Sequence, residues 1–204
     1  MADVGVRPAR RADTDAVARI QMRAWRADYR TFVPAPVLAE LTGADAAEVW
    51  RQRWAEAVTA PPSPRHRLLV AVAGDTVAGF AACGPAGEAD HDPETTAELI
   101  TLRVDPDHAA EGHDSRLLAA TADTLRGDGF RTVISWLFDA DEAQRTFFVS
   151  AGWAPDGAHR TLSFPAPSAG DDAGTAPLTM IRMHTDIGDA GDARPADRPG
   201  PGRP

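Results

Sequence analysis

The sequence lacks several features, and each absence removes a class of protein or site. Cys83 is the only cysteine among 204 residues, so the chain cannot form an intramolecular disulfide or a cysteine-based metal site. No apolar run approaches the roughly 20 residues of a membrane-spanning helix, and the first residues lack the basic and then apolar pattern of a secretory signal. We therefore expect a cytoplasmic protein that makes no membrane contact, with Cys83 as a buried, inert thiol.

Lysine is also missing, and positive charge is scarce. All 21 basic residues are arginines, and 30 acidic residues bring the formal net charge to −9. A nucleic-acid-binding protein normally carries a basic face, so nucleic acid is not an expected partner. The acidic balance favours cationic or neutral substrates, but only weakly.

The remaining composition is that of a globular domain. Hydrophobic residues make up 43% of the chain and charged residues 25%, and the length allows one domain with a sizeable core. We expect this domain to span residues 1–187. Residues 188–204 consist mainly of glycine, alanine, aspartate, arginine and proline and cannot bury enough apolar surface to order themselves. We therefore expect a disordered tail there.

Hydrophobic periodicity and turn residues predict the order of elements. Asp13 is the expected N-cap of the first helix, and Gly74 and Asp75 form a two-residue hairpin loop. A mixed sheet flanked by helices follows. Ligands bind such sheets at the carboxyl ends of strands, here within the unit 98–153. The expected strands are 4–7, 68–73, 76–83, 97–104, 132–138, 162–164 and 178–184, and the expected helices are 13–29, 37–41, 44–60, 115–126 and 141–151.

Three motifs lie in that unit: ELITLRVDP at 98–106, AAEGHDSRLL at 109–118 and DEAQRTFFVSAGW at 141–153. With VRPA at 6–9 and AWRADY at 24–29, their order and spacing resemble the GNAT superfamily of acetyl-coenzyme-A-dependent N-acetyltransferases. The resemblance covers about residues 4–186. Each motif alone is weakly specific, and together they indicate the fold better than the activity.

The resemblance implies an α+β fold in α/β/α layers, with a mixed, mostly antiparallel sheet of about six to seven strands flanked by four helices. It also implies transfer of an acetyl group from acetyl-CoA to a primary amine of a small molecule or peptide by direct attack. Family members often pair, so a homodimer is one assembly that the resemblance suggests.

A loop that leads into a helix holds the cofactor's pyrophosphate through free backbone N–H groups and the helix dipole. The resemblance assigns cofactor contacts to the fourth strand, this loop and the last helix: Leu102, Arg103, Val104, Gly112, His113, Asp114, Ser115, Arg116 and Asp141. Asp141 is equally explained as a helix N-cap.

The loop departs from the family pattern at three positions. Ala109 replaces a glutamine or arginine, Glu111 occupies a usual basic position, and Asp114 replaces a second glycine or alanine. A carboxylate ~5 Å from a phosphate costs roughly 3 kcal/mol at an effective dielectric of about 20. Alternatively, Asp114 caps the helix itself and takes the anion's place.

The catalytic residues implied by the resemblance are incomplete. Glu98 matches a glutamate that acts as general base, directly or through water, although an edge-strand charge facing solvent is the alternative. Trp25 and Tyr29 are assigned to the acceptor pocket, and simple packing is the alternative for Tyr29. Phe148 occupies the place of the family's general-acid tyrosine and has no proton to donate, so Ser150 or solvent would substitute.

These departures leave a second function open, a non-catalytic GNAT-like module that has lost acetyl-CoA binding and binds a ligand or partner. Other chemistries have less support. His108 and His113 lie close in sequence, but no third ligand has metal spacing, so we expect no metal site. The chain contains no Gly-x-Ser-x-Gly element that would indicate an acyl-enzyme mechanism.

Overall fold

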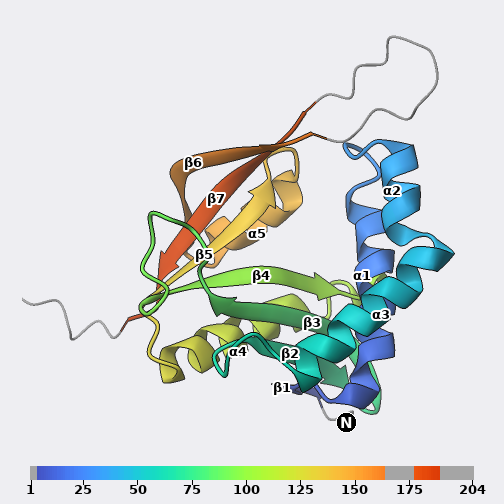
Figure 1. The fold of residues 1–204 in the computed structure, drawn as a ribbon, viewed down its shortest axis with the longest axis horizontal. Coiled ribbons are helices and arrows are strands. Elements are labelled where there is room, and N and C mark those ends of the chain that lie inside the picture. The colour runs from blue at the N-terminus through green and yellow to red at the C-terminus, as the bar shows by residue number, and fades with distance from the viewer. Residues whose placement is uncertain (1–3, 164–176, 189–204) are drawn as a thin grey trace, which may run out of the picture.

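Seven strands and five α-helices make up the part of the chain that the computed structural model describes, residues 4–163 and 177–188 (Figure 1). The strands form one sheet in the order β1-β2-β3-β4-β5-β7-β6. Their bounds are β1 Val4–Pro8, β2 Arg67–Ala73, β3 Thr76–Pro85, β4 Thr96–Val104, β5 Thr132–Phe138, β6 Ala154–Leu162 and β7 Leu178–Asp186. The helices are α1 Thr14–Asp28, α2 Ala35–Thr42, α3 Ala44–Thr59, α4 His113–Gly127 and α5 Glu142–Ser150, with short 3-10 turns η1 Arg11–Asp13 and η2 Pro106–His108.

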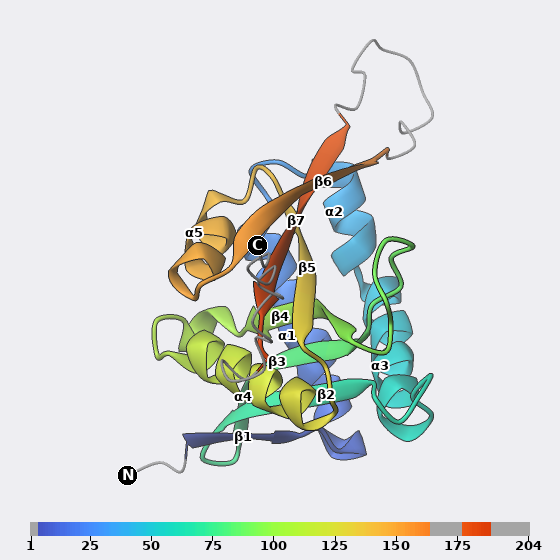
Figure 2. The ribbon, with the colours of Figure 1, turned by 90° about the vertical axis from the view of Figure 1, so that its left-hand side faces the viewer.

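The sheet divides between β4 and β5. These two strands are parallel, whereas every other neighbouring pair is antiparallel. They pair over only three residue pairs, from Thr96 opposite Thr132 to Glu98 opposite Ile134. Figure 2 shows the result: β1 to β4 run across the molecule, while β5 to β7 run steeply upward. The carboxyl-terminal half of β4 therefore leaves its neighbour and opens a fork in the sheet.

Two local features mark the fork. The Ser135 hydroxyl of β5 donates a hydrogen bond to the Leu99 carbonyl of β4 over 2.8 Å. On the other side of β4 the register shifts, because Ala82 faces Thr101 while Cys83 faces Leu99. The residue between them on β4 is thus an extra one, a β-bulge that bends the strand as it leaves β5.

Apolar residues on both faces of the sheet explain the layers. Alternate β2 residues point to opposite faces. Leu69 and Ala71 join a core cluster with residues of α4 and α5, whereas Leu68 and Val70 join one with residues of α1 and, at its edge, α3. Helices therefore cover both faces, with α4 and α5 on one side and α2 and α3 on the other (Figure 2).

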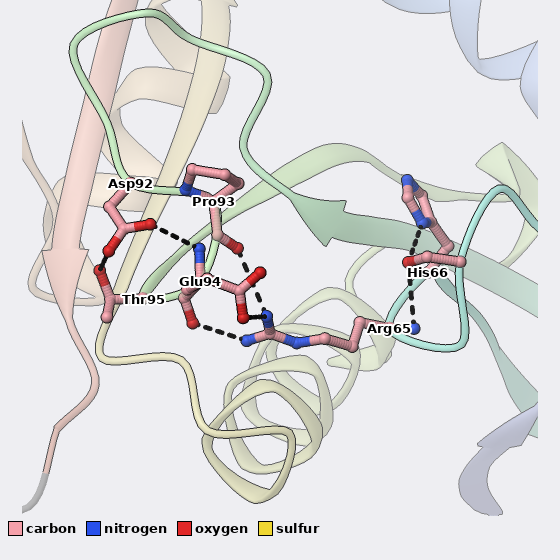
Figure 3. A network of polar contacts seen from close by, with 7 residues as sticks. Arg65, His66, Asp92, Pro93, Glu94 and Thr95 are labelled. Atoms are coloured by element: carbon pink, nitrogen blue, oxygen red, sulfur yellow. Dashed lines mark hydrogen bonds and ion pairs between the residues drawn. The ribbon is translucent and has the colours of Figure 1, made fainter.

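The entry into β4 is fixed by polar contacts from the preceding segments (Figure 3). The Arg65 guanidinium donates to the backbone carbonyl of Glu94 at 2.8 Å and pairs with its carboxylate at 3.2 Å. Asp92 accepts the Glu94 N–H at 2.9 Å, and the Thr95 carbonyl accepts the Arg131 N–H at 2.8 Å. β4 and β5 are thereby held together at their beginnings, so that they separate only at their carboxyl ends.

The expected mixed sheet and its helical layers are confirmed, with one helix more than the four that the resemblance implied. The hairpin loop at Gly74 is also confirmed, with a φ of 60° that favours glycine. Asp13 is the N-cap residue of α1, as expected, but its carboxylate binds Arg7 and makes no capping hydrogen bond to the helix. Two expected boundaries were wrong. Strand β6 begins at Ala154, not at Leu162, and α4 begins two residues early, at His113.

Several expectations fall on residues that the structure does not describe. These are Phe164 at the end of an expected strand and all but the first residue of the tail expected over 188–204. Within the described residues, no helix combines the length and apolar character needed to cross a bilayer.

Replacing Ser135 with alanine tests the fork. Ser135 is 3% exposed, so the variant leaves the Leu99 carbonyl without this donor inside the protein. We expect the free energy of unfolding to fall by about 1–3 kcal/mol, as measured by urea denaturation. Ser150→Ala is the matched control, because this exposed hydroxyl donates only to the nearby Phe147 carbonyl, and its loss should cost within about 0.5 kcal/mol. Equal losses in both variants would contradict the role of Ser135.

Candidate functional site

A cavity of about 360 Å³ lies beside the carboxyl end of β4. Four segments that are distant in sequence line it: the end of α1, the last residues of β4, the loop into α4, and α5. The lining residues are Ala27, Asp28, Leu102, Arg103, Val104, Pro106, His108, Ala109, Ala110, His113, Asp114, Gln144, Phe147 and Phe148. This is the end of the sheet where the sequence predicted a ligand.

Backbone direction makes the end of β4 suitable for polar contacts. The Asp105 N–H, directly after β4, donates a hydrogen bond to the Ala78 carbonyl of β3 at 2.8 Å. Backbone groups of an antiparallel strand alternate in direction, so Leu102 and Val104 direct their N–H groups away from β3, toward the fork. The Leu102 carbonyl accepts from the Arg103 guanidinium at 3.0 Å. The two N–H groups on the open side can therefore serve as donors to a ligand.

The loop into α4 has an unusual backbone. Ala110 has a φ of 63° and Gly112 a φ of 74°, both in the left-handed region, which is rare for alanine. Gly112 is the N-cap of α4. The Asp114 carboxylate accepts the Ser115 N–H at 2.8 Å and so occupies one donor that an anion would use. The Arg116 guanidinium folds back onto the Glu111 carbonyl at 2.7 Å.

Two histidines meet one carboxylate in this loop. Oε2 of Glu111 lies 3.0 Å from Nδ1 of His108 and 3.2 Å from Nε2 of His113. Hydrogen bonds with His108, and then with His113, hold the pKa of the Glu111 carboxyl below its usual range. His113 is 2% exposed, and its other ring nitrogen has no hydrogen-bond partner. Glu111 is thus a third potential ligand beside the two histidines, one that was not predicted from the sequence.

Glu98 lies in the middle of the sheet, opposite Gly84 of β3 and Ile134 of β5. The alternative that Glu98 is a charge on an edge strand is therefore wrong, because β4 is paired on both sides at this residue. Its neighbours on the strand, Ala97 and Leu99, belong to the core under α4, so Glu98 points to the opposite face. It is half-buried.

The surroundings of Glu98 shift the pKa of its carboxyl upward. Burial raises the pKa of its carboxyl, while Arg160 lowers that pKa and Glu88 raises it further. Glu88 also accepts a hydrogen bond from the Trp136 indole of β5 at 2.8 Å. A carboxylate with a raised pKa is a stronger base, which suits a group that must accept a proton.

The acceptor-pocket residues predicted on α1 belong to an aromatic cluster. Tyr29 is 7% exposed and packs edge-on against Phe138, with 5.1 Å between ring centroids, and Trp25 stacks on it at 6.1 Å. The Tyr29 hydroxyl accepts a hydrogen bond from Arg103, which lines the cavity. Burial raises the pKa of this phenol. The packing alternative for Tyr29 is thus observed, while its hydroxyl reaches a cavity-lining side chain.

Three more residues of the sequence analysis, Asp141, Phe148 and Ser150, lie at the start of α5 or within it. Asp141 accepts the Gln144 N–H at 3.0 Å as the N-cap of α5. Ser150, the suggested substitute acid, lines a separate cavity of about 430 Å³ between α4 and α5. Phe148 is 1% exposed and packs on Trp153 at 4.8 Å, so this position supplies an apolar wall.

Burial raises the pKa of the Cys83 thiol to about 12, as suits an inert thiol.

The structure thus brings five predicted cofactor residues to one cavity: Leu102, Arg103, Val104, His113 and Asp114. Gly112, Ser115, Arg116 and Asp141 lie outside its lining, and Glu98, Trp25 and Tyr29 belong to the other face of the sheet or to α1. Sequence reasoning missed His108 and Gln144 as lining residues. The position of His108 in the short turn between β4 and the loop into α4 was the available signal.

Comparisons with known proteins agree with this architecture. A family model described as the acetyltransferase (GNAT) family matches residues 20–153, more than half of the chain. No curated protein matches the sequence.

Solved structures that resemble the chain include the PaiA N-acetyltransferase of Thermoplasma acidophilum in complex with coenzyme A, at 12% identity and TM-score 0.67, covering 90% of this chain and 99% of that one. YncA of Salmonella typhimurium, solved with acetyl-CoA, has 18% identity and TM-score 0.60 over 98% and 99%. The ribosomal-protein-S18-alanine N-acetyltransferase of Escherichia coli has 18% identity and TM-score 0.61 over 94% and 99%. At these identities the likeness establishes the fold.

Glu98→Gln should change the pH dependence of stability. Because the pKa of Glu98 is raised by burial, the folded state binds more protons than the unfolded state between the ordinary value of about 4.3 and the raised value. The parent protein therefore loses stability as pH rises through this window. We expect the glutamine variant to gain stability relative to the parent over the same window and to keep that gain at higher pH.

Urea denaturation across a pH series measures this difference. Glu40→Gln, an exposed residue of α2, removes the same charge and is the control. The same difference at every pH for both variants would show that Glu98 does not carry the effect.

Proposed function

The chain belongs to the acetyltransferase (GNAT) family, and from that premise we propose that residues 1–187 form a domain that transfers an acetyl group from acetyl-CoA to a primary amine of a small molecule or peptide. The observation that carries the proposal is the fork between β4 and β5 beside the 360 Å³ cavity. The fork exposes backbone donors at a position where a thioester can lie. Solved relatives that hold coenzyme A or acetyl-CoA support acetyl-CoA as the co-substrate.

The thioester carbonyl needs a hydrogen-bond donor where negative charge develops. The N–H groups of Leu102 and Val104 face the open side of β4 and are fixed by the pairing of β4 with β3. Donors fixed before the reaction stabilise an oxyanion without a cost of reorganisation at the moment of reaction. We assign them to the polarisation of the acetyl carbonyl.

Glu98 is the proposed general base. The amine nitrogen attacks the acetyl carbon, the carbon–sulfur bond breaks, and Glu98 takes the ammonium proton directly or through water. Its carboxylate also attracts a cationic acceptor. The thiolate leaves without an acid at Phe148, and its pKa near about 8.5 permits departure with solvent protonation. Trp25 and Tyr29, which stack on each other, are assigned to the acceptor side, as the resemblance implies.

The start of α4 is the proposed site for the pyrophosphate. Gly112, Ser115 and Arg116 surround the helix N-terminus, where backbone N–H groups and the helix dipole favour an anion. The second cavity, between α4 and α5, shares Phe147 with the first. Together the two cavities suit a long ligand such as acetyl-CoA, with Asp141 supporting α5 beside the pantetheine arm.

Calorimetric titration with acetyl-CoA tests the proposal first. We expect micromolar binding with one site per chain. A screen of primary amines for release of free thiol from acetyl-CoA then identifies acceptors, and Glu98→Gln should lower kcat about 10²- to 10⁴-fold while leaving the affinity for acetyl-CoA unchanged. Glu40→Gln should behave as the parent.

Absence of acetyl-CoA binding by the parent protein would overturn the proposal. It would leave the non-catalytic module, for which family membership gives no support.

A further inference from the structure

Three side chains that the proposed reaction does not use converge at the entrance of α4. One ligand atom each from His108, Glu111 and His113 lies within 4.8 Å of the other two. The first two side chains come from the end of η2 and the loop, and the third is the first residue of α4. Both histidine nitrogens approach the same carboxylate oxygen, so the three ligand atoms are grouped closely enough to share one ion.

The spacing suits a tetrahedral metal ion. Zinc binds histidine nitrogen and carboxylate oxygen at about 2.0–2.2 Å, which places tetrahedral ligand atoms roughly 3.3 Å apart. The nitrogen-to-oxygen distances of 3.0 Å and 3.2 Å are already close to this value. The two histidine nitrogens lie within 4.8 Å of each other, so adjustments of the His108 and Glu111 side chains bring all three atoms to one ion.

We propose that His108, Glu111 and His113 bind one divalent transition-metal ion of the zinc type, with a fourth coordination position open to the cavity. Two imidazoles and one carboxylate favour such an ion over magnesium or calcium, which prefer oxygen ligands. His108 and His113 both line the cavity, so an ion between them is within reach of its contents. Three protein ligands with one open position are the usual composition of a zinc site that accepts an exogenous ligand.

The charge of the loop indicates what the open position takes. Glu111 and Asp114 outnumber Arg116, and the Arg116 guanidinium is turned onto a backbone carbonyl. A divalent ion reverses this excess of negative charge at the place where, on the proposed function, the pyrophosphate of acetyl-CoA arrives. The ion thereby replaces the cationic side chains that the loop lacks, and a pyrophosphate oxygen is its fourth ligand.

The local fold supports this arrangement. Ala110 adopts a left-handed conformation that alanine rarely has, and this turn leads directly into Glu111 between the two rings. His113 is held by burial at the start of α4, whereas Glu111 is exposed and His108 only partly buried. One ligand is thus rigidly placed and two can adjust around an incoming ion.

Metal binding by the full chain tests the proposal without reference to activity. The protein is stripped with a chelator and titrated with Co²⁺, whose visible absorption reports four-coordinate geometry, and Zn²⁺ affinity is measured by competition with a chromophoric chelator. We expect one ion per chain and the absorption of tetrahedral cobalt. Glu111→Gln and His108→Ala should weaken binding by more than the roughly 10- to 100-fold that loss of an outer-shell partner costs.

Loss of metal binding in these variants can be distinguished from loss of folding. The variants change exposed or partly exposed residues, so thermal denaturation without metal should match the parent, whereas a variant at the buried His113 would not be informative. His159→Ala removes an exposed histidine of β6 outside the cluster and should keep the parent's affinity. Absence of a cobalt band and of stoichiometric zinc binding in the parent would overturn the proposal and leave three side chains joined by hydrogen bonds alone.

The open position is tested by adding acetyl-CoA. The cobalt spectrum should shift, and zinc should tighten acetyl-CoA binding about tenfold in the parent but not in Glu111→Gln, a change of about 1.4 kcal/mol. An unchanged spectrum with unchanged acetyl-CoA affinity would overturn the assignment of the pyrophosphate as fourth ligand. Zinc binding in a protein that does not bind acetyl-CoA at all would refute the proposed function while the metal site stands.

Discussion

Parallel pairing between β4 and β5 ends after three residue pairs, and the candidate site depends on that early end. If the strands stayed paired to Val104, their backbone groups would satisfy one another and leave no donors for a ligand. The β-bulge on β4 and the Ser135 hydroxyl at the branch point accommodate the separation. Figure 2 shows how far the two halves of the sheet then turn apart.

Packing on both faces keeps this opening from collapsing. The start of β4 is tied through Glu94 to Arg65 (Figure 3). The Arg65 guanidinium also lies 3.7 Å from the centre of the Phe130 ring. Phe148 and Trp153 of the α5 region fill the space under β5, and the aromatic cluster around Tyr29 fills the other face. The open half of the fork is thus supported by rigid neighbours, so its donors have a fixed direction before any ligand arrives.

Charge near the cavity is arranged unevenly. Arg103 is the cation on its β4 wall, and its guanidinium is shared between the Leu102 carbonyl and the Tyr29 hydroxyl. At the start of α4, by contrast, the carboxylates of Glu111 and Asp114 lie beside two histidines. An anionic ligand therefore meets backbone dipoles from the helix and an unusual cluster of side chains in the loop. The proposed metal ion supplies the positive charge that an anionic ligand needs at this place.

The sequence by itself determined the order of elements and the family, because these follow from local periodicity, turn residues and spacing. It also predicted that Asp141 caps α5, since a cap involves only neighbours in the chain. Tertiary structure alone decided three matters: that Glu98 lies inside the sheet and not at its edge, that Asp13 pairs with Arg7, and that β6 starts at Ala154. Pairing partners, burial and the electrostatic surroundings of a carboxylate depend on segments far apart in the chain. Glu111 meets two nearby histidines next to a left-handed turn at Ala110. Alanine rarely adopts this conformation, so the sequence does not predict the turn.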